Sequence, residues 1–158
     1  PFQAKIFVNE IINDWVKVKL SKLHVQNFGY IYKKDTQKNN TIEEDWVKAA
    51  EKLINTPYLW GGRDTKGLDC SGLLQLALQA GGIIFPRDTS KQIVSKRLHP
   101  INKKDINRGS LVFWDGHVGI MLDKKNILHA NAFHMNVAVE PLYEACSRMK
   151  NELYYDLT

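Results

Sequence analysis

The apolar residues of this chain follow two different spacings, and the two spacings occupy separate stretches. Between residues 42 and 80 they recur every three or four positions, as on one face of a helix. After Gly109 they form short runs separated by turn sequences. Helices followed by a series of short strands are typical of an α+β domain, in which helices pack on an antiparallel sheet. The sequence therefore predicts an α+β fold.

Three helices are expected before Gly109, two of them in the stretch 42–80. The segment 41–44 (TIEE) has the spacing of a capping box, which predicts a helix over residues 42–55. A second helix is expected over residues 70–80, because two glycines follow its last apolar position. A shorter helix is expected from Asp88 or Thr89 to about residue 97, since either residue can serve as its N-cap.

Turn residues such as Asp115-Gly116 divide the second stretch into strands. Five strands are expected there, over residues 111–114, 117–122, 127–130, 137–140 and 153–155. Three further strands are expected near the N-terminus, over residues 6–12, 15–20 and 30–32.

A polar run over residues 35–40 has the composition of a linker. We therefore expect two parts: residues 1–40, a partial all-β domain with its linker, and residues 41–158, the main domain. The stretch before the linker has about 34 residues, which is short for an independent all-β domain. This part is then either an incomplete barrel or one that residues upstream of Pro1 complete.

The overall composition is that of a globular protein, with 44% apolar and 25% charged residues in a chain of 158. The net charge of +5 is compatible with a nucleic-acid partner, but the basic residues are spread in pairs beside Asp or Asn. We therefore expect no nucleic-acid binding. No run approaches the roughly 18 apolar residues of a membrane span, so none is expected.

Cys70 stands at the start of the second expected helix. A helix N-terminus stabilises a thiolate, which is the form in which cysteine acts as a nucleophile. Asp69 can cap this helix, and Ser71 and Gly72 are small enough to let a substrate approach the sulfur. The spacing alone also fits a small buried side chain, so the argument depends on the partners of Cys70.

Two histidines provide candidate partners. His117 begins one expected strand and His129 ends the next, so a hairpin centred near residue 123 places them opposite each other. His117 can then act as the base for Cys70, while His129 orients the His117 ring. A zinc site made by the same three residues is the alternative. It lacks a short-range ligand pair and an acidic base, so no metal is expected.

Five segments stand out for their order along the chain: 56–62 (TPYLWGG), 69–73 (DCSGL), 109–114 (GSLVFW), 117–120 (HVGI) and 128–130 (LHA). Together they resemble the successive motifs of the NlpC family of bacterial cell-wall peptidases, over roughly residues 42–142. The resemblance implies a papain-like fold and a cysteine peptidase without metal or organic cofactor. Cys70 would be its nucleophile, His117 its base and His129 the third member of the triad.

Further roles follow from this resemblance. Tyr58 would hydrogen-bond near the nucleophile or help to hold the oxyanion, with a core aromatic as the alternative. Asp88 and Thr89 would hold an amine of the substrate, since a carboxylate is the right partner for an ammonium group. Helix capping is the alternative for Asp88, and both roles can hold together. Asp69 and Ser71 flank the nucleophile and would also touch the substrate.

The resemblance also implies the substrate and the alternatives. Family members cleave peptidoglycan peptides, commonly between γ-D-glutamate and a diamino acid such as meso-diaminopimelate. The most similar subgroup carries bacterial SH3-like barrels and acts on stem peptides with a free L-alanine amine. Residues 14–18 and 29–31 look like the tail of such a barrel. Whether the substrate is intact cell wall or recycled peptide stays open. The compartment, cell envelope or cytoplasm, stays open as well. An amidase or acyltransferase, or a non-catalytic cell-wall binding module, are the alternatives.

Two positions depart from the family pattern. Ser110 stands where the family usually has Asp after glycine, which loosens a turn without removing a catalytic group. His134 matches no family catalytic position and is expected to be a loop histidine.

Overall fold

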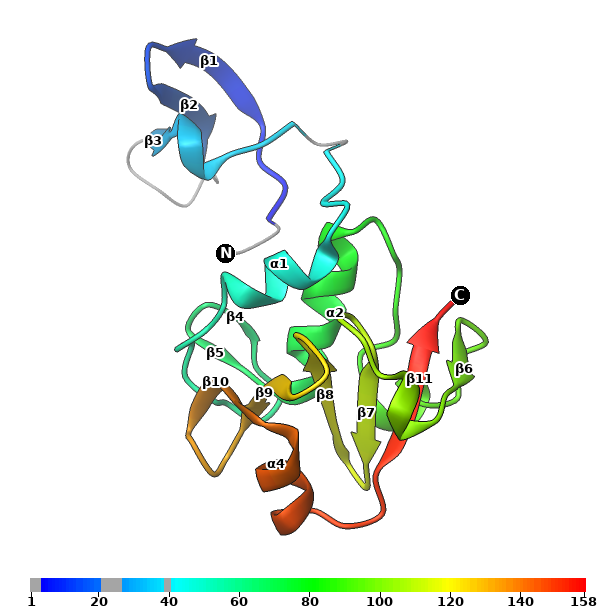
Figure 1. The fold of residues 1–158 in the computed structure, drawn as a ribbon. Helices are drawn as coiled ribbons and strands as arrows, with labels where there is room; N and C mark the ends of the chain where they lie inside the picture. The colour runs from blue at the N-terminus through cyan, green and yellow to red at the C-terminus, as the bar shows by residue number, and fades with distance from the viewer. Residues whose placement is uncertain (1–3, 21–26, 39–40) are drawn as a thin grey trace. The chain divides into compact units, whose positions relative to one another are not determined.

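The computed structural model describes residues 4–20, 27–38 and 41–158, and these divide into two compact units (Figure 1). One unit lies within Gln3–Ile42 and the other spans Glu43–Thr158. Residues 39 and 40 of the expected linker lie outside the described residues. In the described ranges, no helix combines the length and the apolar character that crossing a membrane requires.

The N-terminal unit contains a three-stranded antiparallel sheet with its second strand in the centre. Its elements are β1 (Val8–Ile12), β2 (Trp15–Lys19), β3 (Phe28–Tyr32) and the 3-10 turn η1 (Lys33–Asp35). Val16 and Val18 are buried on one face of β2, as the alternation of a strand requires. The three predicted strands are therefore present, and their assignment to an SH3-like barrel stays a prediction.

The main unit is built on a six-stranded antiparallel sheet in the order β10-β9-β8-β7-β11-β6. Its strands are β6 (Leu98–Pro100), β7 (Leu111–Trp114), β8 (His117–Met121), β9 (Asn126–Asn131), β10 (Asn136–Pro141) and β11 (Leu153–Leu157). Strand β6 lies beyond the predicted set, whereas the five predicted strands are present. The predicted α+β fold class is confirmed.

Helices cover both faces of this sheet (Figure 1). They are α1 (Trp46–Glu51), α2 (Cys70–Ala80), α3 (Thr89–Gln92) and α4 (Leu142–Arg148), with the 3-10 turn η2 (Lys103–Asp105) and the short hairpin of β4 (Arg63–Asp64) and β5 (Gly67–Leu68). Helices α1 and α2 share a core with Phe113 and Ile120. Helix α4 packs with Val112 and Met121, which alternate to the other face.

Two predicted helices are shorter than expected. Helix α1 begins at Trp46, because the backbone N–H of Glu43 donates to the carbonyl of Ala80 (2.9 Å) instead of entering a helix. The predicted capping box is therefore wrong, and Asp45 is the N-cap. Helix α3 ends at Gln92 and not near residue 97, since the chain turns there to pair β6 with β11.

Candidate active site

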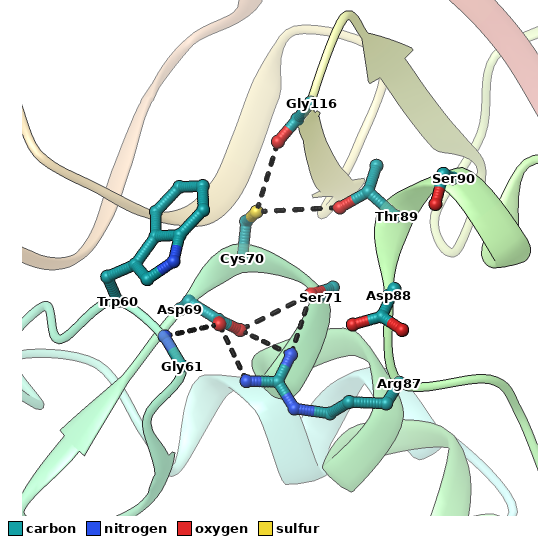
Figure 2. Close-up of a pocket in the computed structure, with 10 residues that line it drawn as sticks. All are labelled: Trp60, Gly61, Asp69, Cys70, Ser71, Arg87, Asp88, Thr89, Ser90 and Gly116. Carbon is teal, nitrogen blue, oxygen red and sulfur yellow. Dashed lines mark hydrogen bonds and ion pairs between the residues drawn. The ribbon is translucent and has the colours of Figure 1, made fainter.

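Cys70 is the first residue of α2, and it is one of the residues that line a pocket (Figure 2). Asp69 is the N-cap of the helix, and its carboxylate accepts a hydrogen bond from the backbone N–H of Gly72 (2.7 Å). The sulfur lies 3.9 Å from Oγ1 of Thr89 and 4.0 Å from the carbonyl oxygen of Gly116. The helix N-terminus is thus directed at the thiol, as the sequence predicts.

The pocket has a volume of about 420 Å³. It brings together the sequence-predicted residues Asp69, Cys70, Ser71, Asp88 and Thr89, and adds Trp60, Gly61, Arg87, Ser90 and Gly116. Trp60 is 82% exposed at this pocket, which is unusual for a large aromatic side chain. The pocket therefore joins a cysteine thiol, the carboxylate of Asp88 and an exposed aromatic ring.

Arg87 forms hydrogen bonds with Asp69 and Ser71, the two residues that flank Cys70 (Figure 2). Its guanidinium donates to both carboxylate oxygens of Asp69, at 2.6 and 2.8 Å, and to Oγ of Ser71 at 2.8 Å. Asp69 also accepts from the backbone N–H of Gly61 at 2.9 Å. Because these internal bonds engage both oxygens of Asp69, its carboxylate holds the loop and the helix together. Contact of Asp69 or Ser71 with substrate stays a prediction.

Asp88 is the N-cap residue of α3 by position, but its side chain makes no capping hydrogen bond. The Asp88 side chain lines the pocket and is 59% exposed, and its carboxylate lies 3.6 Å from Nζ of Lys91. Asp88 thus remains open to a ligand. Thr89, in contrast, has its hydroxyl near the Cys70 sulfur.

His117 and His129 are in contact, as predicted, with Nε2 of His117 2.9 Å from Nδ1 of His129. The predicted register is wrong, however, because Ile120 pairs with Leu128 and the hairpin is centred at residue 124. The carboxylate of Asp123 accepts from the backbone N–H groups of Lys125 and Asn126 and holds a three-residue turn. The partner of His117 shifts by two residues, so both rings stay on one face.

Gly119 makes room for this contact. A Cβ atom there would lie 2.4 Å from Cδ1 of Ile127 and 3.4 Å from Cβ of His129. The glycine therefore lets the side chains of β9 lie over β8, and the His129 ring reaches diagonally to His117. Trp114 covers the other side of His117, with ring centroids 5.7 Å apart.

Burial shifts the pKa values of both His117 and Cys70. It lowers the pKa of His117 to about 3, and the neighbouring His129 adds to this effect. Burial also raises the pKa of the Cys70 thiol, and hydrogen bonds with the Val118 backbone and Thr89 oppose it only in part. Both shifts favour the neutral forms, a thiol at Cys70 and an imidazole at His117. Among the described residues, the hydrogen bonds of this thiol go to Thr89 and Gly116 rather than to His117.

Tyr58 lies close to the nucleophile. Burial raises the pKa of its phenol, and the negative charges that Cys70 and Asp69 carry when ionised raise it further. The phenol is therefore a neutral hydrogen-bond donor near Cys70, and its role toward an oxyanion stays a prediction.

Glu140 is a polar neighbour of the histidines that the sequence reasoning missed. Its Oε1 lies 2.7 Å from Nε2 of His129, and its carboxylate is buried. A signal was present in the pattern: Ala138 pairs with His129 across the hairpin of β9 and β10, so Glu140 points to the same face.

Among the residues that the structure describes, no group of three possible metal ligands includes Cys70. In residues 4–20, 27–38 and 41–158, the group of possible ligands that gathers is His129, His134 and Glu140, with ligand atoms within 4.8 Å of one another. His134 lies in the loop after β9, where its backbone N–H and its ring both meet Oδ1 of Asn131.

Comparisons with known proteins show what this chain is similar to. The chain is 31% identical over 123 residues to dipeptidyl-peptidase 6 of Lysinibacillus sphaericus, covering 78% of this chain and 45% of that protein. It is 25% identical over 125 residues to a Bacillus cereus protein named gamma-D-glutamyl-L-lysine dipeptidyl-peptidase, covering 74% of this chain and 37% of that protein. The chain thus spans less than half the length of these curated relatives.

A solved structure and a family model extend the comparison. The crystal structure of an NlpC/P60 family protein from Bacillus cereus matches with a TM-score of 0.72 and 22% identity, covering 87% of this chain and 48% of that one. At this identity the likeness establishes the fold alone. Residues 55–154 match the model of the NlpC/P60 family. They include Cys70, both histidines and Glu140, and the chain therefore belongs to the NlpC/P60 family.

Proposed function

We propose that this protein is a cysteine peptidase that hydrolyses peptidoglycan stem peptides at the bond between γ-D-glutamate and a diamino acid. The observation that carries the proposal is the pocket in which Cys70, at the N-terminus of α2, faces the open carboxylate of Asp88. His117 follows Gly116, whose carbonyl oxygen lies 4.0 Å from the sulfur, and with its partner His129 it is the candidate base. The names of the relatives that act as dipeptidyl-peptidases and endopeptidases support the same activity.

The chemistry begins with proton transfer. His117 takes the proton of the Cys70 thiol, and the resulting sulfur nucleophile attacks the γ-glutamyl carbonyl carbon. The backbone N–H of Cys70 and the phenol of Tyr58 stabilise the oxyanion. The imidazolium returns its proton to the leaving amine of the diamino acid, which leaves an acyl-enzyme. Water activated by His117 then hydrolyses the thioester and restores the thiol.

The neutral resting pair is compatible with this sequence of steps. A thiol and an imidazole that are both neutral need transfer only one proton when substrate arrives. Catalytic hydrogen bonds in substrate-free sites are often long and tighten in the complex. The Cys70 side chain is therefore expected to leave Thr89 and turn toward His117 when a peptide fills the pocket.

Asp88 gives the proposal its substrate specificity. An exposed carboxylate without a capping bond is suited to hold the ammonium group of a free N-terminal L-alanine. We therefore propose that stem peptides with a free L-alanine amine are the substrates. Thr89 and Ser71 lie beside Asp88 at the same pocket and offer further hydroxyl groups.

The test is incubation with defined peptides followed by mass spectrometry. L-Ala-γ-D-Glu peptides ending in meso-diaminopimelate or L-lysine are compared, each with a free or acetylated amine. We expect cleavage after D-Glu, with the free amine preferred. Absence of cleavage in every peptide would overturn the proposal, and equal rates on free and acetylated peptides would remove the role of Asp88.

An amidase or acyltransferase with the same triad is the second candidate, because the acceptor alone distinguishes the reactions. Reaction in water labelled with heavy oxygen separates them. Hydrolysis places one labelled oxygen in the D-Glu carboxyl group, whereas transfer to an amine places none. A non-catalytic binding module would leave all peptides intact.

A further inference from the structure

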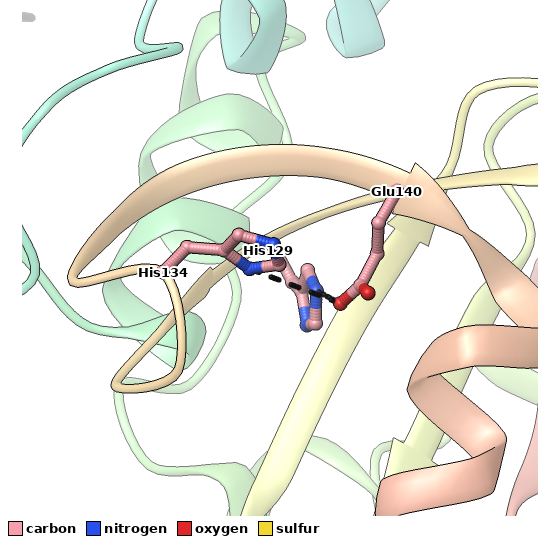
Figure 3. Close-up of side chains that lie close together, drawn as sticks. All are labelled: His129, His134 and Glu140. Atoms are coloured by element: carbon pink, nitrogen blue, oxygen red, sulfur yellow. Dashed lines mark hydrogen bonds and ion pairs between the residues drawn. The ribbon is translucent and has the colours of Figure 1, made fainter.

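His129 contacts a second buried group on the side that faces away from His117. Its Nε2 atom lies 2.7 Å from Oε1 of Glu140, whose side chain is only 4% exposed (Figure 3). The guanidinium of Arg148 at the end of α4 binds both oxygens of the same carboxylate. A continuous chain of hydrogen bonds therefore runs from His117 through His129 to Glu140 and Arg148.

The ionised state of Glu140 fixes where the protons of this chain lie. Burial alone raises the pKa of Glu140, but the hydrogen bonds from Arg148 and His129 outweigh it and leave the pKa lowered. An ionised carboxylate only accepts hydrogen bonds, so Nε2 of His129 must carry the hydrogen. Since burial lowers the pKa of His129 and keeps its ring neutral, Nδ1 of His129 has a free lone pair.

The tautomer of His129 in turn determines which nitrogen of His117 carries the hydrogen. Because Nδ1 of His129 accepts, Nε2 of His117 must donate across the 2.9 Å contact. In neutral His117 the remaining nitrogen, Nδ1, is then free to take a proton. We propose that Glu140 is a positioning residue that sets the tautomers of both histidines and so leaves Nδ1 of His117 as the base. The proposed function supplies the reaction that this base serves.

A cation between His129, His134 and Glu140 is the competing explanation for the cluster. Arg148 already occupies both oxygens of Glu140, and a metal ion there would face its positive guanidinium. The ring of His134 bonds to Asn131 and lies 4.0 Å from Oε1 of Glu140, farther than a ligand distance. Phe133 also stacks on Arg148, 4.2 Å from its ring centroid to the guanidinium carbon, and holds it in place.

The decisive test is a nitrogen-15 NMR measurement of the imidazole tautomers in the wild-type protein. We expect hydrogen on Nε2 of both His129 and His117, with Nδ1 of each ring unprotonated. Hydrogen on Nδ1 of either ring would overturn the proposal. The measurement requires no turnover, so it also decides the matter for a chain that cleaves no peptide.

Glu140→Gln tests the consequence for catalysis. The amide oxygen is expected to stay with Arg148, so the amide NH₂ group meets Nε2 of His129 and forces the hydrogen onto Nδ1. Both tautomers then reverse, and we expect kcat to fall by about 10- to 100-fold with KM unchanged. Glu144→Gln, a change on the exposed side of α4, is the matched control and should keep wild-type kcat. An unchanged kcat in folded Glu140→Gln would overturn the proposal.

A double variant separates positioning from general destabilisation. If Glu140 acts through His129, adding Glu140→Gln to His129→Ala should lower kcat by less than twofold beyond the single change. A full additional 10-fold loss in the double variant would show that Glu140 acts by another route, and would overturn the proposal.

Discussion

The pocket side and the histidine side of the candidate site are built alike, since each contains a buried carboxylate bound by an arginine. On the pocket side Arg87 binds Asp69, and on the histidine side Arg148 binds Glu140. The other partners differ. Asp69 accepts from backbone N–H groups of Gly61 and Gly72, whereas Glu140 meets the ring of His129.

The two ion pairs therefore have different uses. Backbone N–H groups do not change protonation, so the Asp69 carboxylate fixes a loop and a helix start in space. An imidazole has two tautomers, so the Glu140 carboxylate also selects a protonation pattern. Loss of the first pair should therefore reduce stability and rate together, and loss of the second should reduce the rate more than the stability.

The largest expected effect on the rate is that of replacing Cys70. Cys70→Ala should lower kcat/KM by about 10⁴-fold or more, because it removes the proposed nucleophile. Its melting temperature should stay near that of wild type. Cys146→Ala, which removes the other cysteine, is the control and should retain wild-type activity. Cys70→Ala activity within about tenfold of wild type would contradict the assignment of the nucleophile.

On the histidine side, His129→Ala should lower the rate by about 10- to 1,000-fold, because the His117 ring loses the partner at its Nε2. His129→Gln should recover part of the loss, since an amide can still form one hydrogen bond with an imidazole. Rates and melting temperatures of both variants are compared, and Cys70 should remain open to alkylation in each.

His129→Leu distinguishes catalysis from packing. His129 is 1% exposed, so a side chain that only fills space should be replaced by leucine without loss of activity. We expect His129→Leu to be as stable as the alanine variant or more so, and as slow. An active leucine variant would remove His129 from the triad.

On the pocket side, Asp69→Asn should lower the free energy of unfolding by about 1–3 kcal/mol, because Arg87 loses its charged partner. The rate should fall as well, since Asp69 holds the start of α2. Chemical denaturation measures the first effect. Asp105→Asn, at an exposed aspartate, is the control. A stability loss no larger than that of Glu140→Gln would erase the proposed difference between the two pairs.

The residues that sequence reasoning identified share one property: their positions follow from local patterns. Cys70 follows a capping aspartate, and His117 and His129 lie on neighbouring strands whose turn can be read from Asp123. Even an error of one residue in the hairpin centre kept both rings on one face, because strand alternation has a period of two. The order of strands β7 to β10 was predictable for the same reason.

The parts that were not predicted depend on contacts between distant segments. Helix α1 begins late because Glu43 bonds to Ala80, and β6 exists because it pairs with β11 at the end of the chain. The ion pair of Arg87 and Asp69 joins residues 18 positions apart. No local pattern specifies such partners. The raised pKa of Cys70 likewise depends on burial, which outweighs the hydrogen bonds that lower it.

A smaller effect is expected for Asp88, which lies on the pocket side but belongs to neither ion pair. Asp88→Asn should raise KM for peptides with a free amine about tenfold and leave acetylated peptides unaffected. Stability should not change, because the side chain makes no capping bond. Lys91→Met removes the nearby cation and is the control. An equal rise of KM for both kinds of peptide would show that Asp88 does not contact the amine.

The smallest expected effect is a pH dependence of the protein's stability that arises from His117, on the histidine side. Folding lowers the pKa of His117 to about 3, below the ordinary value of 6.5 that applies in the unfolded chain. As the pH falls from 6.5 toward 3, the unfolded state therefore binds a proton that the folded state does not, and stability is lost. His117→Gln removes this proton, so its stability curve should be flatter than that of wild type by up to about 1.4 kcal/mol per pH unit across that window. His99→Gln, at an exposed histidine of β6, is the control and should follow the wild-type curve. Parallel curves for wild type and His117→Gln between pH 6.5 and 3 would mean that His117 is as easily protonated in the folded protein as in the unfolded chain.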